Sequence, residues 1–169
     1  MTVTEQRDNV SNLAKQDSKK AYSLAKTIES PWFKAQALSW VARYSSDNIL
    51  EIINEAKISA NKCDDDYKKA TVRSWEIVAL AECNYIKEAK LALKESVDLA
   101  KKVEPLSSRA EALFSLFQSA YYIDKDELKM VYDTLIETCN PKEYWRAKRA
   151  IKNATDILNE KYNPRVFFW

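Results

Sequence analysis

Apolar residues recur along the chain at the three- and four-residue spacing of amphipathic helices. Ala21, Leu24, Ala25 and Ile28 occupy positions i, i+3, i+4 and i+7, which places them on one face of a helix. Similar stripes follow one another along most of the chain, and the strict alternation of a β-strand is weak throughout. The pattern therefore predicts an all-α chain of helices with short connections.

Proline and aspartate residues mark the places where these helices are expected to begin. Pro31, Pro105 and Pro141 lie between apolar stripes, at positions where a missing N–H costs least. The run Asp64–Asp66 comes just before a new stripe, as N-caps and first-turn acids do.

The stripes belong to an internal repeat. Residues 24–31, Leu-Ala-Lys-Thr-Ile-Glu-Ser-Pro, match residues 99–105, Leu-Ala-Lys-Lys-Val-Glu-Pro, at an offset of 75, and further matches at an offset of 35 pair Trp40 with Trp75. Together they indicate a unit of about 35 to 40 residues, each a helical hairpin, repeated about four times. We expect one domain over residues 1–163, with units at about 1–31, 32–65, 66–105 and 106–141, a capping helix at 142–163 and an aromatic tail at 164–169.

The units resemble the tetratricopeptide repeat (TPR). Leu113 and Leu116 occupy the places of that family's first-helix tryptophan and leucine, and Glu88-Ala89 resembles the pair that begins its second helix. The resemblance implies a right-handed α-solenoid of antiparallel helix hairpins. It also implies that first helices line a concave groove in which a peptide lies.

The resemblance makes the outward positions of the first helices the candidate binding residues. Arg43 and Arg73 are expected to clamp a carboxylate through bidentate donors, and Phe114 and Tyr121 to add apolar contact area. The full set of groove candidates is Gln36, Ser39, Arg43, Arg73, Glu76, Leu80, Glu111, Phe114, Gln118 and Tyr121.

The matched tryptophans leave the register of the second unit open. The offset of 35 makes Trp40 and Trp75 equivalent, whereas the TPR register puts only Trp75 at the family's aromatic place. We expect both rings in the core, stacked on the next unit.

The chain ends in an unusual aromatic segment. Pro164 ends the last helix, and Val166, Phe167, Phe168 and Trp169 follow. Exposed, these side chains would form a docking peptide for a neighbouring chain, and the protein would then be a homo-oligomer. Folded back, they would seal the end of the array, which is the arrangement we favour.

Composition removes several classes of function. The 169 residues include no glycine and no histidine, so phosphate-cradling glycine loops and histidine-based catalysis or zinc binding are excluded. Balanced charge, +2 overall, gives no nucleic-acid stripe, and no apolar run is long enough to span a membrane. Three cysteines and a polar N-terminus without the apolar core of a signal peptide favour the cytoplasm.

Candidate chemistry is sparse. Cys63 and Cys139 align with buried stripe positions, so we expect them in the core, and the Asp64–Asp66 run lacks the alternating ligands of a calcium loop. We predict no catalytic residue, cofactor or metal. The sequence favours a protein–protein interaction module, an adaptor that holds a peptide or helix of a partner in its groove; the alternative is a self-assembling structural protein whose tail docks on a neighbouring chain.

Overall fold

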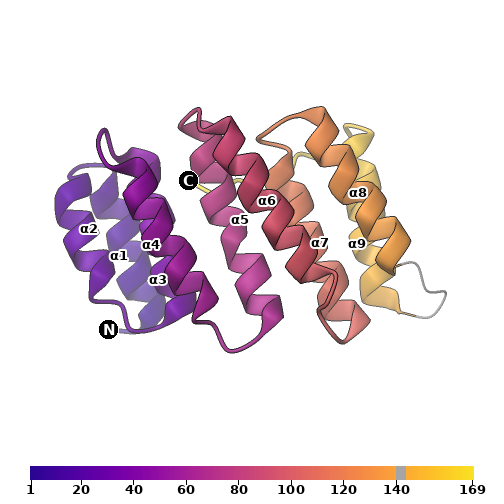
Figure 1. Ribbon diagram of the computed structural model, residues 1–169, viewed down its shortest axis with the longest axis horizontal. Coiled ribbons are helices and arrows are strands. Elements are labelled where there is room, and N and C mark those ends of the chain that lie inside the picture. Colours follow the sequence, from indigo (N-terminus) through magenta and orange to yellow (C-terminus); the bar gives the residue numbers. More distant parts are fainter. Residues whose placement is uncertain (140–143) are drawn as a thin grey trace.

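The computed structural model describes residues 1–139 and 144–169, and within them the regular structure is entirely α-helical. The all-α prediction is confirmed (Figure 1). The helices are α1 (Val3–Ala14), α2 (Ser18–Lys26), α3 (Pro31–Tyr44), α4 (Ile49–Asn61), α5 (Asp66–Glu82), α6 (Ile86–Ala100), α7 (Leu106–Ala120), α8 (Lys125–Cys139) and α9 (Trp145–Leu158).

Helix starts follow the local signals in the sequence. The Asp65 side chain caps α5 by accepting a hydrogen bond from the Lys68 backbone N–H at 2.7 Å, and Pro31 opens α3. Pro105 stands at the N-cap of α7, and Pro141 lies outside the described residues. Because the chain has no glycine, Asn48 takes a left-handed backbone conformation with φ 57° at the start of α4.

The helices form two layers. Consecutive odd-numbered helices, the first-helix layer, pack against one another along the whole array. The even-numbered helices each pack on their hairpin partner, and α4, α6 and α8 stand in front of the first-helix layer in Figure 1. Among the described residues, consecutive even-numbered helices do not pack extensively, so the first-helix layer is the more tightly spaced one. The right-handed TPR-type solenoid stays a prediction.

The core lies between the two layers. Leu38, Ile77, Leu93, Leu113 and Leu135 come from five different helices, are fully buried and belong to one continuous apolar cluster. Burial of a leucine or isoleucine side chain contributes about 1.5–3 kcal/mol, so such a cluster holds the hairpins together.

Alanines at matching positions of the repeat are buried near the starts of the first helices. They are Ala35, Ala70 and Ala110, on α3, α5 and α7. A methyl side chain keeps the contact narrow and has the best helix propensity. The repeat seen in the sequence is thus a repeat of buried positions on successive first helices.

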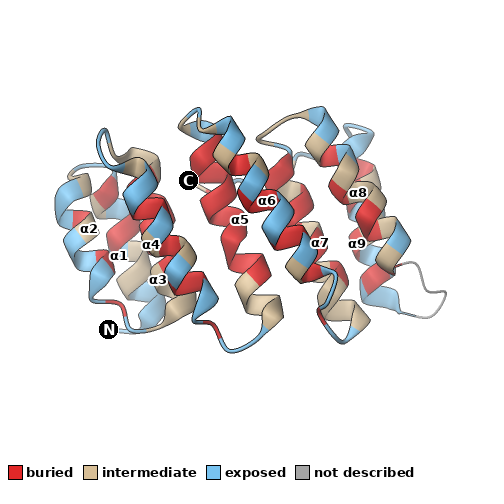
Figure 2. Cartoon of the chain, in the orientation of Figure 1, coloured by how far each residue is buried: buried red, intermediate tan, exposed pale blue. Residues whose placement is uncertain are grey.

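The central helix α5 is buried on all sides. Every residue from Ala70 to Ala81 is buried, and Figure 2 shows this continuous burial between α4 and α6. The helices α3, α4, α6 and α7 all pack against α5. The remaining side is covered by the C-terminal segment of the chain.

The last helix and the tail complete the array. α9 packs on α7 and α8 with Ala147, Ala150 and Ala154 buried, and Arg146 and Lys148 are exposed. The chain then turns back, so that its C-terminus lies beside α5 in Figure 1. The tail folds back, as the sequence favoured, but it does not seal the end of the array; it runs along the first-helix layer instead.

Candidate functional site

Phe167 anchors the C-terminal tail in a slot on the first-helix layer. Its side chain is 0% exposed, and its ring centroid lies 5.4 Å from that of Trp75 and 5.9 Å from that of Tyr122, both edge-to-face. Val78 completes this small cluster, which is separate from the main core. Edge-to-face pairs at these distances are a favourable geometry for aromatic rings.

Two hydrogen bonds fix the backbone of the tail at Arg165. The Arg165 N–H donates to Gln118 Oε1 at 2.9 Å, and the Tyr122 hydroxyl donates to the Arg165 carbonyl at 2.7 Å. The Arg165 guanidinium lies 4.6 Å from the centroid of the Trp75 ring, in a cation–π arrangement. Burial, together with the charge of Arg7, lowers the pKa of Arg165.

The tail reaches as far as α3. Phe168 and Trp169 meet the ring of Trp40 edge-to-face at 5.0 and 5.1 Å, and the Lys15 ammonium lies 5.3 Å from the same ring. Trp169 itself remains 56% exposed. We call the surface under the tail the tail groove; it is formed by Trp40, Trp75, Val78, Gln118 and Tyr122.

Two donors in the tail groove have no acceptor. The indole N–H groups of Trp40 and Trp75 are buried, and neither finds a hydrogen-bond partner among the described residues. A buried donor left without an acceptor costs about 1–3 kcal/mol. The tail thus meets the polar groups of Gln118 and Tyr122 but leaves the two indole N–H groups without an acceptor.

The candidate residues on α3 are held within the chain. Gln36 is buried and accepts a hydrogen bond from Arg7 at 2.7 Å, and buried Ser39 donates to a backbone carbonyl one turn earlier. Arg43 is half-buried and forms an ion pair with Glu82 at the end of α5. Burial alone would lower the pKa of Arg43, but the hydrogen bond and charge of Glu82 raise it.

Of the candidates on α7, Gln118 contacts the tail. Phe114 is half-buried and packs on the main core, Tyr121 is 50% exposed, and Glu111 forms an ion pair with Arg149 of α9 at 3.5 Å. The α7 residues are therefore spread around the helix surface, and the structure brings one of them into the tail groove.

The candidates on α5 point away from the tail groove. Arg73 is 5% exposed, and its guanidinium donates two hydrogen bonds of 2.8 Å to Glu76 and one of 2.9 Å to Glu95 of α6. Lys57 of α4 also pairs with Glu95, at 2.8 Å, and Leu80 lies in the main core. Arg73 is thus committed to internal carboxylates and is not free to clamp a ligand.

Electrostatics agree with this internal role. Burial alone would lower the pKa of Arg73, but the hydrogen bonds and charges of Glu76 and Glu95 raise it. Burial would raise the pKa of Glu95, whereas Lys57 and Arg73 together lower it. The charged forms of both side chains are therefore favoured in the folded protein.

A difference of two residues in register explains the placement of the α5 set. At the offset of 35, the equivalents of Gln36, Ser39 and Arg43 are Thr71, Ser74 and Val78, not Arg73, Glu76 and Leu80. Two residues rotate a side chain by about 200° around a helix, to its opposite face. Val78 does lie in the tail groove, so the offset of 35 gives the register of this unit.

The tryptophans are buried as expected, but for a different reason. Trp40 and Trp75 are 0% and 3% exposed. Trp75 does contact Trp32 of the preceding hairpin, at 6.4 Å, yet the rings of the tail also cover both tryptophans. Their match at an offset of 35 was the one signal in the sequence that could have located the tail groove.

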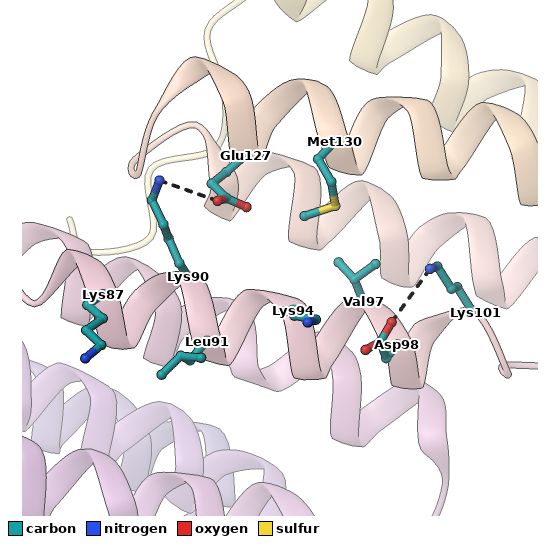
Figure 3. Close-up of a pocket in the computed structure, with 9 residues that line it drawn as sticks. All are labelled: Lys87, Lys90, Leu91, Lys94, Val97, Asp98, Lys101, Glu127 and Met130. Atoms are coloured by element: carbon teal, nitrogen blue, oxygen red, sulfur yellow. Dashed lines mark ion pairs between the residues drawn. The ribbon is translucent and has the colours of Figure 1, made fainter.

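A second hollow lies between α6 and α8, on the other layer. It has a volume of about 430 Å³, and Figure 3 shows its lysine-rich lining. Lys90 pairs with Glu127 at 3.5 Å and Lys101 with Asp98 at 3.6 Å, so part of its charge is neutralised within the chain. The lining residues are Lys87, Lys90, Leu91, Lys94, Val97, Asp98, Lys101, Glu127 and Met130.

The cysteines occupy structural positions. Cys63 and Cys139 are buried, which confirms the core prediction, and burial raises the pKa of both thiols. Over residues 1–139 and 144–169, no group of three His, Cys, Asp or Glu side chains is arranged to hold a metal ion. The same ranges contain no helix with the length and apolar character needed to cross a membrane.

Comparison with known proteins gives a distant likeness. No family model matches the chain, and no solved structure matches it significantly. The chain is 28% identical over 131 residues to eukaryotic translation initiation factor 3 subunit K of Brugia malayi. The alignment covers 75% of this chain and 52% of that protein, so the chain spans about half the length of its relative.

Proposed function

We propose that this protein is a non-enzymatic interaction subunit that binds a segment of a partner protein along the tail groove. One observation carries the proposal: the groove already holds a non-helical aromatic segment, with Phe167 fully buried between Trp75 and Tyr122. A surface that orders one such segment has the shape and chemistry to order another.

The composition of the groove supports this role. Tryptophan and tyrosine are enriched among the residues that dominate binding energy at protein interfaces, because they offer large rigid contact areas with a polar edge. Trp40, Trp75 and Tyr122 are of this kind, and Gln118 adds an acceptor for a backbone N–H. The groove can therefore fix both the side chains and the backbone of a bound segment.

The similarity to an initiation factor subunit also supports it. The relative is, by its name, one subunit of a larger factor. We extend this to the present chain as a proposal: it works within a protein assembly in the cytoplasm, as a TPR-like adaptor without a cofactor.

The alternative, self-assembly through the tail, has less support. The contacts of Phe167 and Phe168 lie within one chain, so the tail has a binding surface without a second copy. Light scattering of the wild-type protein separates the two readings, because self-assembly requires a mass above that of one chain.

Tyr122→Ala and Tyr121→Ala form a matched pair for testing the proposal. Tyr122 lines the tail groove and contacts Phe167, whereas its neighbour Tyr121 is half exposed and meets only the edge of the Tyr122 ring, not the tail. With tagged full-length protein and quantitative mass spectrometry, we expect a partner captured by wild type and by Tyr121→Ala to be lost with Tyr122→Ala. Equal capture by both variants would exclude the tail groove as the binding surface.

A further inference from the structure

We propose that the tail groove selects segments with the chemistry of the chain's own tail, and that the tail is a resident competitor which a partner must displace. The preferred ligand is a non-helical segment of five residues: a cation, any residue, a phenylalanine and then two aromatic residues, as in residues 165–169. This inference rests on the proposed function, because it names the class of partner for the same groove.

Each position of the tail defines a requirement. Phe167 fills the closed slot, so a ring is required there. Arg165 lies over the face of Trp75, so a cation is favoured two residues earlier. Phe168 and Trp169 present their rings to Trp40, whereas Val166 is 61% exposed and is therefore unrestricted.

The contacts of the tail are sufficient to keep it in the groove, but they leave some groups of the groove unsatisfied, so that a partner segment can replace it. Two hydrogen bonds at Arg165 hold its backbone, and the connection from residue 159 to residue 164 contains no helix. Among the described residues, the buried indole N–H groups of Trp40 and Trp75 find no acceptor while the tail is in place. A bound segment that offers an acceptor to either donor is favoured over the tail, because it removes a cost that the tail leaves.

Tethering sets the strength of the competition. A segment joined by a short flexible connection has an effective concentration on the order of 1 mM at its site. The factor by which the tail weakens a free segment is one plus this concentration divided by the tail's own dissociation constant, so a constant of about 0.1 mM gives a factor of about 10 and a micromolar one about 1,000. Substitutions that release the tail from the groove without shortening the chain remove this competition, so the affinity of a free segment should rise by the same factor.

The test uses the full-length protein and a fluorescein-labelled peptide, Asn-Pro-Arg-Val-Phe-Phe-Trp, which copies residues 163–169. Fluorescence anisotropy measures its binding to wild type, to Phe167→Ala/Phe168→Ala, which releases the tail, and to Val166→Ala, the matched control. We expect the released variant to bind at least tenfold more tightly than wild type, and Val166→Ala to behave as wild type. Equal binding to the released variant and wild type, or no binding to a released variant with unchanged helical circular dichroism, would overturn the proposal.

Two further measurements secure the interpretation. A peptide with alanine at the place of Phe167 should lose its binding to the released variant; if it binds equally, the slot is not what selects the ligand. If the double variant loses helicity, Phe167→Ala alone takes its place, with the same expected result.

The outcome is separable from that of the proposed function. If the released variant binds the peptide tightly but Tyr122→Ala loses no partner, the proposed selectivity holds and the adaptor role is rejected. A partner lost in Tyr122→Ala but no peptide binding would keep the adaptor role and reject the selectivity.

Discussion

Replacement of Glu76 by glutamine tests whether Arg73 belongs to an internal ion pair and not to a ligand site. Arg73 and Glu76 are both buried, and two hydrogen bonds of 2.8 Å join them. Removing one partner of a buried ion pair costs about 3–5 kcal/mol, because the other charge stays buried without it. Since Glu95 remains as a second partner of Arg73, we place the loss at about 3 kcal/mol.

Urea unfolding followed by circular dichroism measures this loss. With a slope of about 2 kcal/mol/M, a loss of about 3 kcal/mol lowers the midpoint by about 1.5 M. Glu51→Gln, at an exposed position of α4, is the matched control and should change the free energy of unfolding by less than about 0.5 kcal/mol. A loss below about 1 kcal/mol for Glu76→Gln would refute the reasoning. The double variant Arg73→Leu/Glu76→Leu should be more stable than Glu76→Gln, because replacing both partners by apolar residues leaves no buried charge without a partner. A double variant less stable than Glu76→Gln would also refute the reasoning.

Two further predictions follow from shifted pKa values and a third from the burial of the cysteines. The pKa of Glu95 is lowered in the folded protein, so its ionised form stabilises the fold at pH values above the unfolded pKa of about 4.3, and this stabilisation is lost as the pH falls. Glu95→Gln should therefore make the melting temperature fall less steeply in acid than it does in wild type, and an unchanged fall would contradict the assignment. The hydrogen bond to Glu55 raises the pKa of Tyr22 to about 12, so an ultraviolet titration of wild type should show one tyrosine that ionises later than the others. In Glu55→Gln the pKa of this tyrosine should fall toward about 10, and a pKa that stays at about 12 would reject the assignment. Half-buried Cys83 should react with a thiol reagent before fully buried Cys139, and equal rates would show that burial does not control access.

Sequence alone was sufficient where a local signal acts on a local structure. The apolar stripes predicted the helices, and Asp65 and Pro31 stand at helix starts because capping and a missing N–H are properties of a single turn. The matched segments 24–31 and 99–105 likewise recur at the ends of α2 and α6. These features need no knowledge of distant contacts.

The register of α5 could not be predicted in the same way. A helix usually reveals its orientation by a polar face, but α5 is buried on every side from Ala70 to Ala81. In the sequence, Arg73 and Glu76 look like part of a solvated face. In the structure they are buried and pair with each other, and Arg73 also pairs with Glu95 of α6, which Lys57 of α4 contacts in turn. Only the folded arrangement shows that these charges meet.

The path of the tail also depended on distant contacts. Phe167 and Phe168 indicate an apolar segment in the sequence, but no neighbouring residue indicates that this segment packs on Trp75 and Trp40. Gln118 was the predicted groove residue that meets the tail. Its side-chain oxygen accepts a hydrogen bond from the backbone N–H of Arg165, a residue 47 positions away in the sequence.

The return of the tail to α3 changes how the array is expected to unfold. In a linear stack of repeats each unit touches only its neighbours, so the ends fray independently and unfolding spreads stepwise. Here Phe168 joins the last part of the chain to Trp40 in the second hairpin, a contact of high sequence separation. Such a contact slows folding, but it couples the unfolding of the C-terminal segment to that of the second hairpin. The array should therefore melt in a single transition. A partner that lifts the tail would break this link, and the terminal hairpins would then open on their own.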